Sequence, residues 1–119
     1  MPKESSSRVK IFYPRYSRAE LVKRIQGRLA ALAEILPLKR VVLFGSWAKG
    51  KATAFSDVDL LVVYADPPRE DAYQIVWKSL DIRGLEPHVY SQQEATQRKR
   101  SLKQMAEDGI LLFPPTQTG

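Results

Sequence analysis

The run of β-branched and aromatic residues at positions 40–44 stops abruptly at Gly45, and this transition constrains the fold more than any other feature of the sequence. Such a run is typical of a buried strand that enters a tight turn. Residues 46–50 then have the composition of one or two helical turns. Amides at a helix start, together with the Ser46 hydroxyl, can hold phosphate oxygens, and a glycine lets the backbone approach the ligand closely. Taken alone, this nest is a weak signal of phosphate binding.

Two aspartates follow the turn at the start of a second hydrophobic run, residues 58–64. Side chains alternate in direction along a strand, so Asp57 and Asp59 are expected on one face. Two neighbouring carboxylates repel each other unless a cation lies between them. Because Mg²⁺ binds a few carboxylates together with phosphate and water oxygens, the pair predicts a metal-triphosphate site beside the nest. In isolation, an Asp-x-Asp pair is more often a solvated strand end.

The combined pattern resembles the signature of the minimal nucleotidyltransferases, the small members of the DNA polymerase β-like superfamily. The positions that match the family's pattern are Gly45, Ser46, Ala48, Gly50, Ser56, Asp57, Asp59 and Leu60. Residue-level similarity covers residues 41–63, and the order of elements extends the resemblance over most of the chain. Many relatives have arginine where Trp47 and Lys49 stand here. Lys49 keeps the charge, whereas Trp47 supplies a side chain suited to stacking or core packing.

The resemblance implies a nucleotidyltransferase palm of α+β (α/β) class, with a small mixed β-sheet covered by helices. It implies Mg²⁺-dependent transfer of a nucleoside monophosphate from a triphosphate to a hydroxyl of a protein or RNA. We expect the transferred group to be AMP. Two Mg²⁺ ions are expected, bound by Asp57, Asp59 and a third carboxylate. The nucleotide, expected to be ATP, would be bound by Gly45, Ser46, Lys49 and Ser56.

Glu86 is the best match to the family's third catalytic and metal-binding carboxylate, which is normally Asp on a later strand. Glu is one methylene longer, which leaves the metal geometry open. Pro87 cannot donate to a sheet ladder, so this strand is expected at an edge or to be irregular. His88, the only histidine in the chain, should share the face of Glu86. It either orients that carboxylate, contacts the substrate or, the interpretation we favour, has a structural role.

Helical spacing and capping boxes predict the remaining elements. A capping box at residues 17–20 opens a helix that ends at Pro37, and residues 69–82 form a second helix. A second capping box at residues 91–94 opens a helix to about residue 107, and residues 110–113 form a last strand. Tyr73, Trp77 and Met105 are expected to pack in the core. The nucleotidyltransferase domain is thus expected over residues 17–113. An N-terminal tail, residues 1–16, precedes it, and residues 9–13 of this tail could add a strand. Residues 114–119 are expected to form a C-terminal tail.

Composition excludes several classes of chemistry. The chain of 119 residues has no cysteine and one histidine, which rules out disulfides, thiolate nucleophiles and cysteine- or histidine-rich metal sites. Its apolar runs are too short to span a membrane and the N-terminus is polar, so we expect a cytoplasmic protein that does not associate with a membrane. A net charge of +6 favours polyanionic partners such as RNA, although solvated helix faces would carry the same charge.

Three functions stay open at this point. The first is a stand-alone nucleotidyltransferase. The second is the antitoxin of a toxin–antitoxin pair, because minimal nucleotidyltransferases are often encoded beside helical HEPN-type proteins; it would modify a ribonuclease toxin or neutralise it by binding alone. The third is a catalytically weak protein that keeps only the nucleotide pocket. A domain this small would leave the nucleotide open to water, so a second copy or a partner subunit is expected to complete the site.

Overall fold

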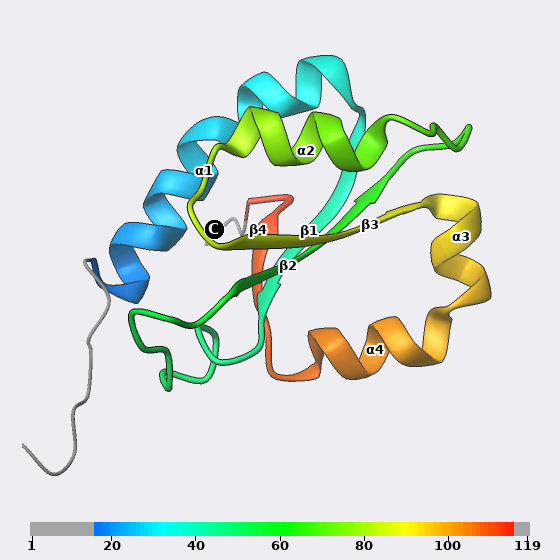
Figure 1. Ribbon diagram of the computed structural model, residues 1–119. Coiled ribbons are helices and arrows are strands. Elements are labelled where there is room, and N and C mark those ends of the chain that lie inside the picture. Colours follow the sequence, from blue (N-terminus) through cyan, green and yellow to red (C-terminus); the bar gives the residue numbers. More distant parts are fainter. Residues whose placement is uncertain (1–15, 116–119) are drawn as a thin grey trace, which may run out of the picture.

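The computed structural model describes residues 16–115, and its elements follow one another as helix, two strands, helix, strand, two helices and strand (Figure 1). The helices are α1 (Arg18–Ile35), α2 (Ala72–Leu80), α3 (Gln92–Gln97) and α4 (Lys99–Glu107). The strands are β1 (Leu38–Phe44), β2 (Val58–Tyr64), β3 (Leu85–Ser91) and β4 (Ile110–Phe113). The possible strand at residues 9–13 lies outside the described residues.

The described strands form a mixed sheet in the order β3-β2-β1-β4. Strand β1 is antiparallel to both β2 and β4, whereas β2 and β3 run parallel. This sheet and its helices confirm the predicted fold class. Strand β3, which contains Pro87, lies at an edge, as the missing amide hydrogen predicted.

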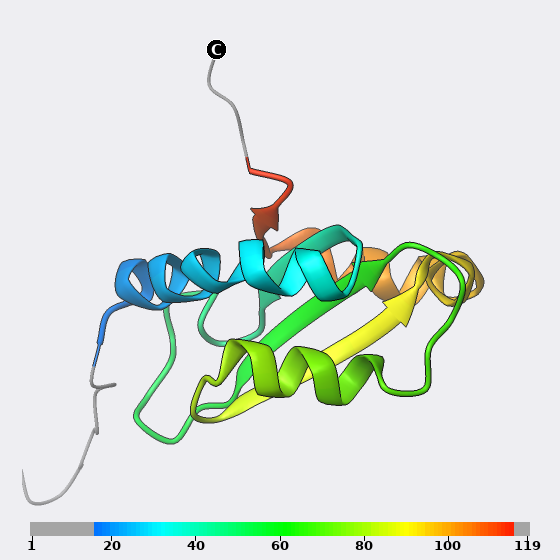
Figure 2. The same ribbon diagram turned by 90° about the horizontal axis from the view of Figure 1, so that it is seen from above.

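The two faces of the sheet are covered unequally. Helices α1 and α2 lie side by side over one face (Figure 2), where the main core includes the fully buried Leu21, Ile25 and Leu32 of α1. The opposite face has a smaller core, in which Leu102 of α4 packs on Val42, Leu61 and Val63. Since α4 covers only part of that face, polar side chains at the strand ends can remain accessible there.

Helix α1 begins where the capping box predicted. The Ser17 hydroxyl accepts a hydrogen bond from the Glu20 amide at 3.2 Å, and the Glu20 carboxylate accepts one from the Ser17 amide at 2.8 Å. The Arg18 guanidinium donates to the Ala48 carbonyl at 2.8 Å. This bond fixes the helix start against the loop that follows β1.

Three expected helices differ from those observed. Residues 45–50 form consecutive turns rather than a helix: one α-type bond joins the Lys49 amide to the Gly45 carbonyl at 3.2 Å, and Gly50 then takes a left-handed φ of 74°. The second helix begins at Ala72 instead of residue 69. The expected helix over residues 92–107 breaks at Arg98, just after Thr96 donates to the Gln92 carbonyl at 3.0 Å, a back-bond that bends helices.

The prediction that Tyr73 and Trp77 pack in the core is wrong. Helix α2 buries Ala72, Val76 and Leu80 along one stripe, which places the two aromatic side chains one position further round the helix. They are 50% and 52% exposed. Met105 packs against the smaller core as predicted. The outer surface of α2 therefore presents an aromatic pair spaced by one helical turn.

Replacing Gly27 by Ala is expected to raise the free energy of unfolding by about 1 kcal/mol, because alanine loses less backbone entropy in a helix interior. Gly27 lies within α1, and nothing lies within 4 Å of a Cβ added there. Urea denaturation measures the change. As a contrasting control, Gly109→Ala should destabilise, since its Cβ would lie 2.5 Å from Val42 Cγ1 and 2.9 Å from the Leu43 carbonyl. A destabilised Gly27→Ala variant would contradict the prediction.

Candidate active site

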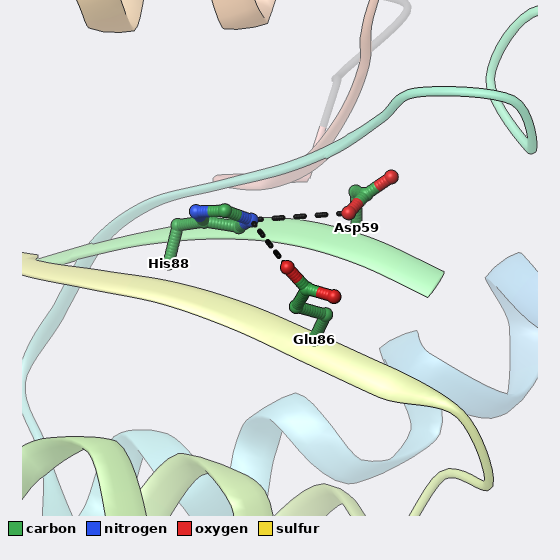
Figure 3. Close-up of side chains that lie close together, drawn as sticks. All are labelled: Asp59, Glu86 and His88. Atoms are coloured by element: carbon green, nitrogen blue, oxygen red, sulfur yellow. Dashed lines mark ion pairs between the residues drawn. The ribbon is translucent and has the colours of Figure 1, made fainter. Parts of the chain in front are cut away.

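The candidate site lies where β2 and β3 run side by side, on the sheet face that points away from α1 and α2 (Figure 3). In the strand register, Asp59 of β2 stands beside Glu86 of β3 on one side and Phe44 of β1 on the other. Cross-strand neighbours share a face of the sheet, and His88 shares it too, two residues beyond Glu86. The parallel pairing of β2 with β3 therefore brings two of the three predicted carboxylates, Asp59 and Glu86, together.

Asp59, Glu86 and His88 form a compact group of possible metal ligands. One ligand atom from each lies within 4.8 Å of the others. The His88 Nε2 atom is 3.8 Å from Asp59 Oδ1 and 3.9 Å from Glu86 Oε1. Dashed lines mark these two pairs in Figure 3. Both separations exceed hydrogen-bond length, and this buried nitrogen has no hydrogen-bond partner among residues 16–115. An unpartnered nitrogen between two carboxylates is the arrangement that a bound cation would complete.

The environment of Asp59 disfavours its charge in the absence of a ligand. Partial burial raises the pKa of this carboxyl above its usual value, and the nearby charge of Asp57 raises it further. His88 acts in the opposite direction and lowers the pKa. A cation bound beside Asp59 would offset both the desolvation and the like-charge repulsion.

Asp57 lies less centrally than the sequence predicted. It precedes the first residue of β2 and is exposed, so strand alternation does not position it. Within the part of the chain that the structure describes, its carboxylate is not one of the three ligand groups that lie within 4.8 Å of one another. Its influence on the pKa of Asp59 nevertheless places its charge near the group.

The turn after β1 packs directly against Asp59. Gly45 has a left-handed φ of 76°, and a Cβ added there would overlap the Oδ2 atom of Asp59. The hydrogen bonds inside this turn use the amides of Lys49, Gly50 and Lys51. Among residues 16–115, the amides of Ser46 and Trp47 donate to no other protein group. The predicted phosphate nest and the predicted metal ligand are thus in contact.

The other predicted nucleotide-binding residues lie around this turn. Lys49 is exposed. Ser56 has a structural task, because its hydroxyl accepts a hydrogen bond from the Thr53 amide at 2.8 Å and closes the loop ahead of β2. Trp47 is only 5% exposed and stacks on Tyr16 with ring centroids 5.9 Å apart, so it fills the core.

The nucleotidyltransferase domain family matches the chain over residues 23–112, which includes β1, β2, β3 and all but the last residue of β4. The chain belongs to this family. The match confirms the resemblance seen in the sequence and, at the level of the family, the predicted enzyme class. No curated protein sequence matches the chain significantly.

Solved structures that share the fold of this nucleotidyltransferase domain include the following three. A proposed nucleotidyltransferase from Sulfolobus solfataricus is 20% identical, with a TM-score of 0.56 over 79% of this chain and 80% of that one. A mutant of the toxin-antitoxin MntA-HpeT is 21% identical, with a TM-score of 0.51 over 77% and 74% of the two chains. A toxin-antitoxin solved with AMP-PNP is 23% identical, with a TM-score of 0.52 and the same coverages. At these identities the similarity shows the fold.

The position of His88 between the carboxylates is the site feature that sequence reasoning undervalued. The alternation in Glu86-Pro87-His88 did place His88 on the face of Glu86. Its approach to Asp59 follows only from the parallel register, in which His88 pairs with Leu61 of β2.

The structure describes no helix in residues 16–115 that is long and apolar enough to cross a membrane.

Proposed function

We propose that this domain transfers a nucleoside monophosphate, AMP from ATP, to a hydroxyl of a protein or RNA, and that it does so as the antitoxin of a toxin–antitoxin pair. The observation that carries the proposal is the contact between the Gly45 turn and Asp59, with Glu86 and His88 beside it. A phosphate-binding turn against a cluster of metal ligands is what chemistry on a triphosphate requires.

The donor set at the site fits a divalent cation. Asp59 and Glu86 offer carboxylate oxygens, and Asp57 adds a nearby charge. The buried His88 Nε2 has no hydrogen-bond partner in the part of the chain that the structure describes. Mg²⁺ is the ion that the family resemblance implies. When bound, a divalent ion would neutralise triphosphate charge and polarise the phosphoryl group under attack.

The chain's own residues would position the reactants. The amides of Ser46 and Trp47, which donate to no group within the described residues, would bind β- and γ-phosphate oxygens, while exposed Lys49 would add positive charge. Glu86 is 52% exposed on an edge strand, so it can reach an acceptor hydroxyl and take up its proton. Positioning and charge neutralisation account for most catalysis in phosphoryl transfer, so no covalent nucleophile is needed.

Two surfaces support a macromolecular acceptor. A basic pocket of about 380 Å³, lined by Arg40, Lys99 and Lys103 among others, lies beside α4, the helix on the same side of the sheet as the site. It suits a polyanion such as RNA. The exposed Tyr73 and Trp77 on α2 suit a protein partner, and a helical HEPN-type toxin is the partner we propose, in a hetero-oligomer. The toxin-antitoxin structures that share the fold support this choice.

Incubating the purified protein with α-labelled ATP, a divalent metal and candidate acceptors tests the function. We expect label to move to the product of the adjacent gene, with weaker or no transfer to bulk tRNA. Omitting the metal should remove the signal, because the triphosphate and the carboxylates are both anionic. Transfer to neither macromolecule, with ATP binding retained, would contradict the enzymatic proposal.

The competing proposal is an antitoxin that binds nucleotide and masks its partner without turnover. Its support is that Glu86 stands where the family normally carries a third aspartate. The two proposals separate when Glu86→Gln is tested for neutralising the partner. Loss of both labelling and neutralisation favours transfer, whereas neutralisation without labelling favours binding alone.

A further inference from the structure

We propose that His88 is a metal ligand through its Nε2 atom, and that this nitrogen makes the site bind Mn²⁺ or Co²⁺ in preference to Mg²⁺. The inference deepens the proposed function, since it concerns the ion at the same site. It replaces the structural role that the sequence favoured for this histidine.

The position of the imidazole is the first argument. Nε2 lies almost equally far from Asp59 Oδ1 and Glu86 Oε1, at 3.8 Å and 3.9 Å. Metal–ligand bonds to imidazole nitrogen and carboxylate oxygen are about 2.0–2.2 Å long, so two ligands of one ion can lie at most about 4.2 Å apart. An ion between the three side chains therefore needs only small side-chain adjustments, and Glu86, half exposed, is free to make them.

The burial of the nitrogen is the second argument. Nε2 is shielded from solvent and accepts or donates no hydrogen bond among the described residues. A buried polar atom without a partner is unfavourable, and such atoms are rare in proteins unless a water or an ion satisfies them. The ring also packs against Phe44 with centroids 5.1 Å apart, which helps to hold the nitrogen toward the carboxylates.

The ligand chemistry determines the preference. Mg²⁺ takes oxygen ligands almost exclusively, whereas affinity for a site with an imidazole nitrogen rises from Mn²⁺ through Co²⁺ along the first transition row. A site with one nitrogen and two carboxylate oxygens keeps enough oxygen character to hold a phosphate-bound ion. It should therefore discriminate against Mg²⁺ more strongly than a site with three carboxylates.

The chain offers an unambiguous spectroscopic test, because His88 is its only histidine. Tag-free protein loaded with Mn²⁺ alone, and with Mn²⁺ plus inorganic tripolyphosphate, is examined by electron spin echo envelope modulation. Tripolyphosphate contains no nitrogen, so an imidazole ¹⁴N signal can come only from His88. We expect this signal in the wild type and its loss in His88→Ala. Bound Mn²⁺ without ¹⁴N modulation under both conditions, or no Mn²⁺ binding at all, overturns the proposal.

Calorimetry with metal alone provides a second measurement. His88→Ala should lower Mn²⁺ affinity by about tenfold or more, and His88→Asp should lower the ratio of Mn²⁺ to Mg²⁺ affinity by a similar factor. Glu107→Gln on α4 is the matched control and should leave both affinities unchanged. An unchanged ratio in His88→Asp would contradict the inference. None of these readouts depends on transfer: nitrogen ligation without transfer would refute the proposed function alone, and transfer without nitrogen ligation would refute the inference alone.

Discussion

Replacing Asp59 by Asn is expected to reduce nucleotidyl transfer by about 100-fold or more, since one group that stabilises the reacting phosphates typically accounts for a loss of this size. Asp59 is the central member of the candidate site: it faces His88, pairs with Glu86 in the strand register and touches the Gly45 turn. Asn keeps the shape of the side chain but loses the charge that would bind the cation. Labelled transfer under single-turnover conditions measures the effect.

The fold should tolerate this substitution. Burial and the charge of Asp57 both raise the pKa of Asp59, which means that the charged form is disfavoured in the folded protein. Removing the charge should therefore leave the metal-free protein as stable as the wild type or slightly more stable. Asp108→Asn, an exposed change just after α4, is the matched control and should leave transfer unchanged. Wild-type transfer rates in Asp59→Asn would exclude this carboxylate from the chemistry.

Features that depend on neighbouring residues could be predicted from the sequence. The Ser17 capping box and the leucines that follow it determine the start and the buried side of α1, and both interactions are local. Pro87 indicated an edge strand because a missing amide hydrogen is a property of the residue itself. The turn at Gly45 was likewise predictable, because a glycine that ends a hydrophobic run is a local signal, although the helical turns expected after it do not form.

Features that depend on contacts between distant segments could not. No glycine or proline marks the helix break at Arg98. This break allows Leu102 of α4 to pack against the sheet. The exposure of Trp77 depends on which stripe of α2 faces the core. The apolar spacing predicted a helix here, with its start three residues too early, but it did not show which stripe would be buried. The meeting of His88 with Asp59 requires the parallel pairing of β2 and β3, which local periodicity does not encode.

Replacing Gly45 by Ala is expected to reduce transfer and triphosphate affinity nearly as much as Asp59→Asn, and also to destabilise the fold. The left-handed backbone at φ 76° suits glycine, and a non-glycine residue held in such a conformation costs about 1–3 kcal/mol. In addition, the new methyl group would overlap Asp59 Oδ2, so the carboxylate or the turn has to move. Transfer assays and calorimetric titration with an ATP analogue measure the functional loss, and urea denaturation measures the stability.

Gly50→Ala separates the two causes. Gly50 has a similar φ of 74°, but the nearest atom to an added Cβ is Arg18 Nη1 at 3.9 Å, so the substitution introduces backbone strain without pressing on Asp59. It should therefore lower stability while transfer is largely kept. The double variant Gly45→Ala with Asp59→Ala tests whether the overlap with Asp59 causes the larger loss of stability at Gly45. If it does, the double variant should be destabilised by less than the sum of the two single changes, because the truncated side chain at position 59 leaves room for the new methyl group. Strict additivity, or equal loss of transfer in both glycine variants, would show that Gly45 serves the turn alone and does not position the carboxylate.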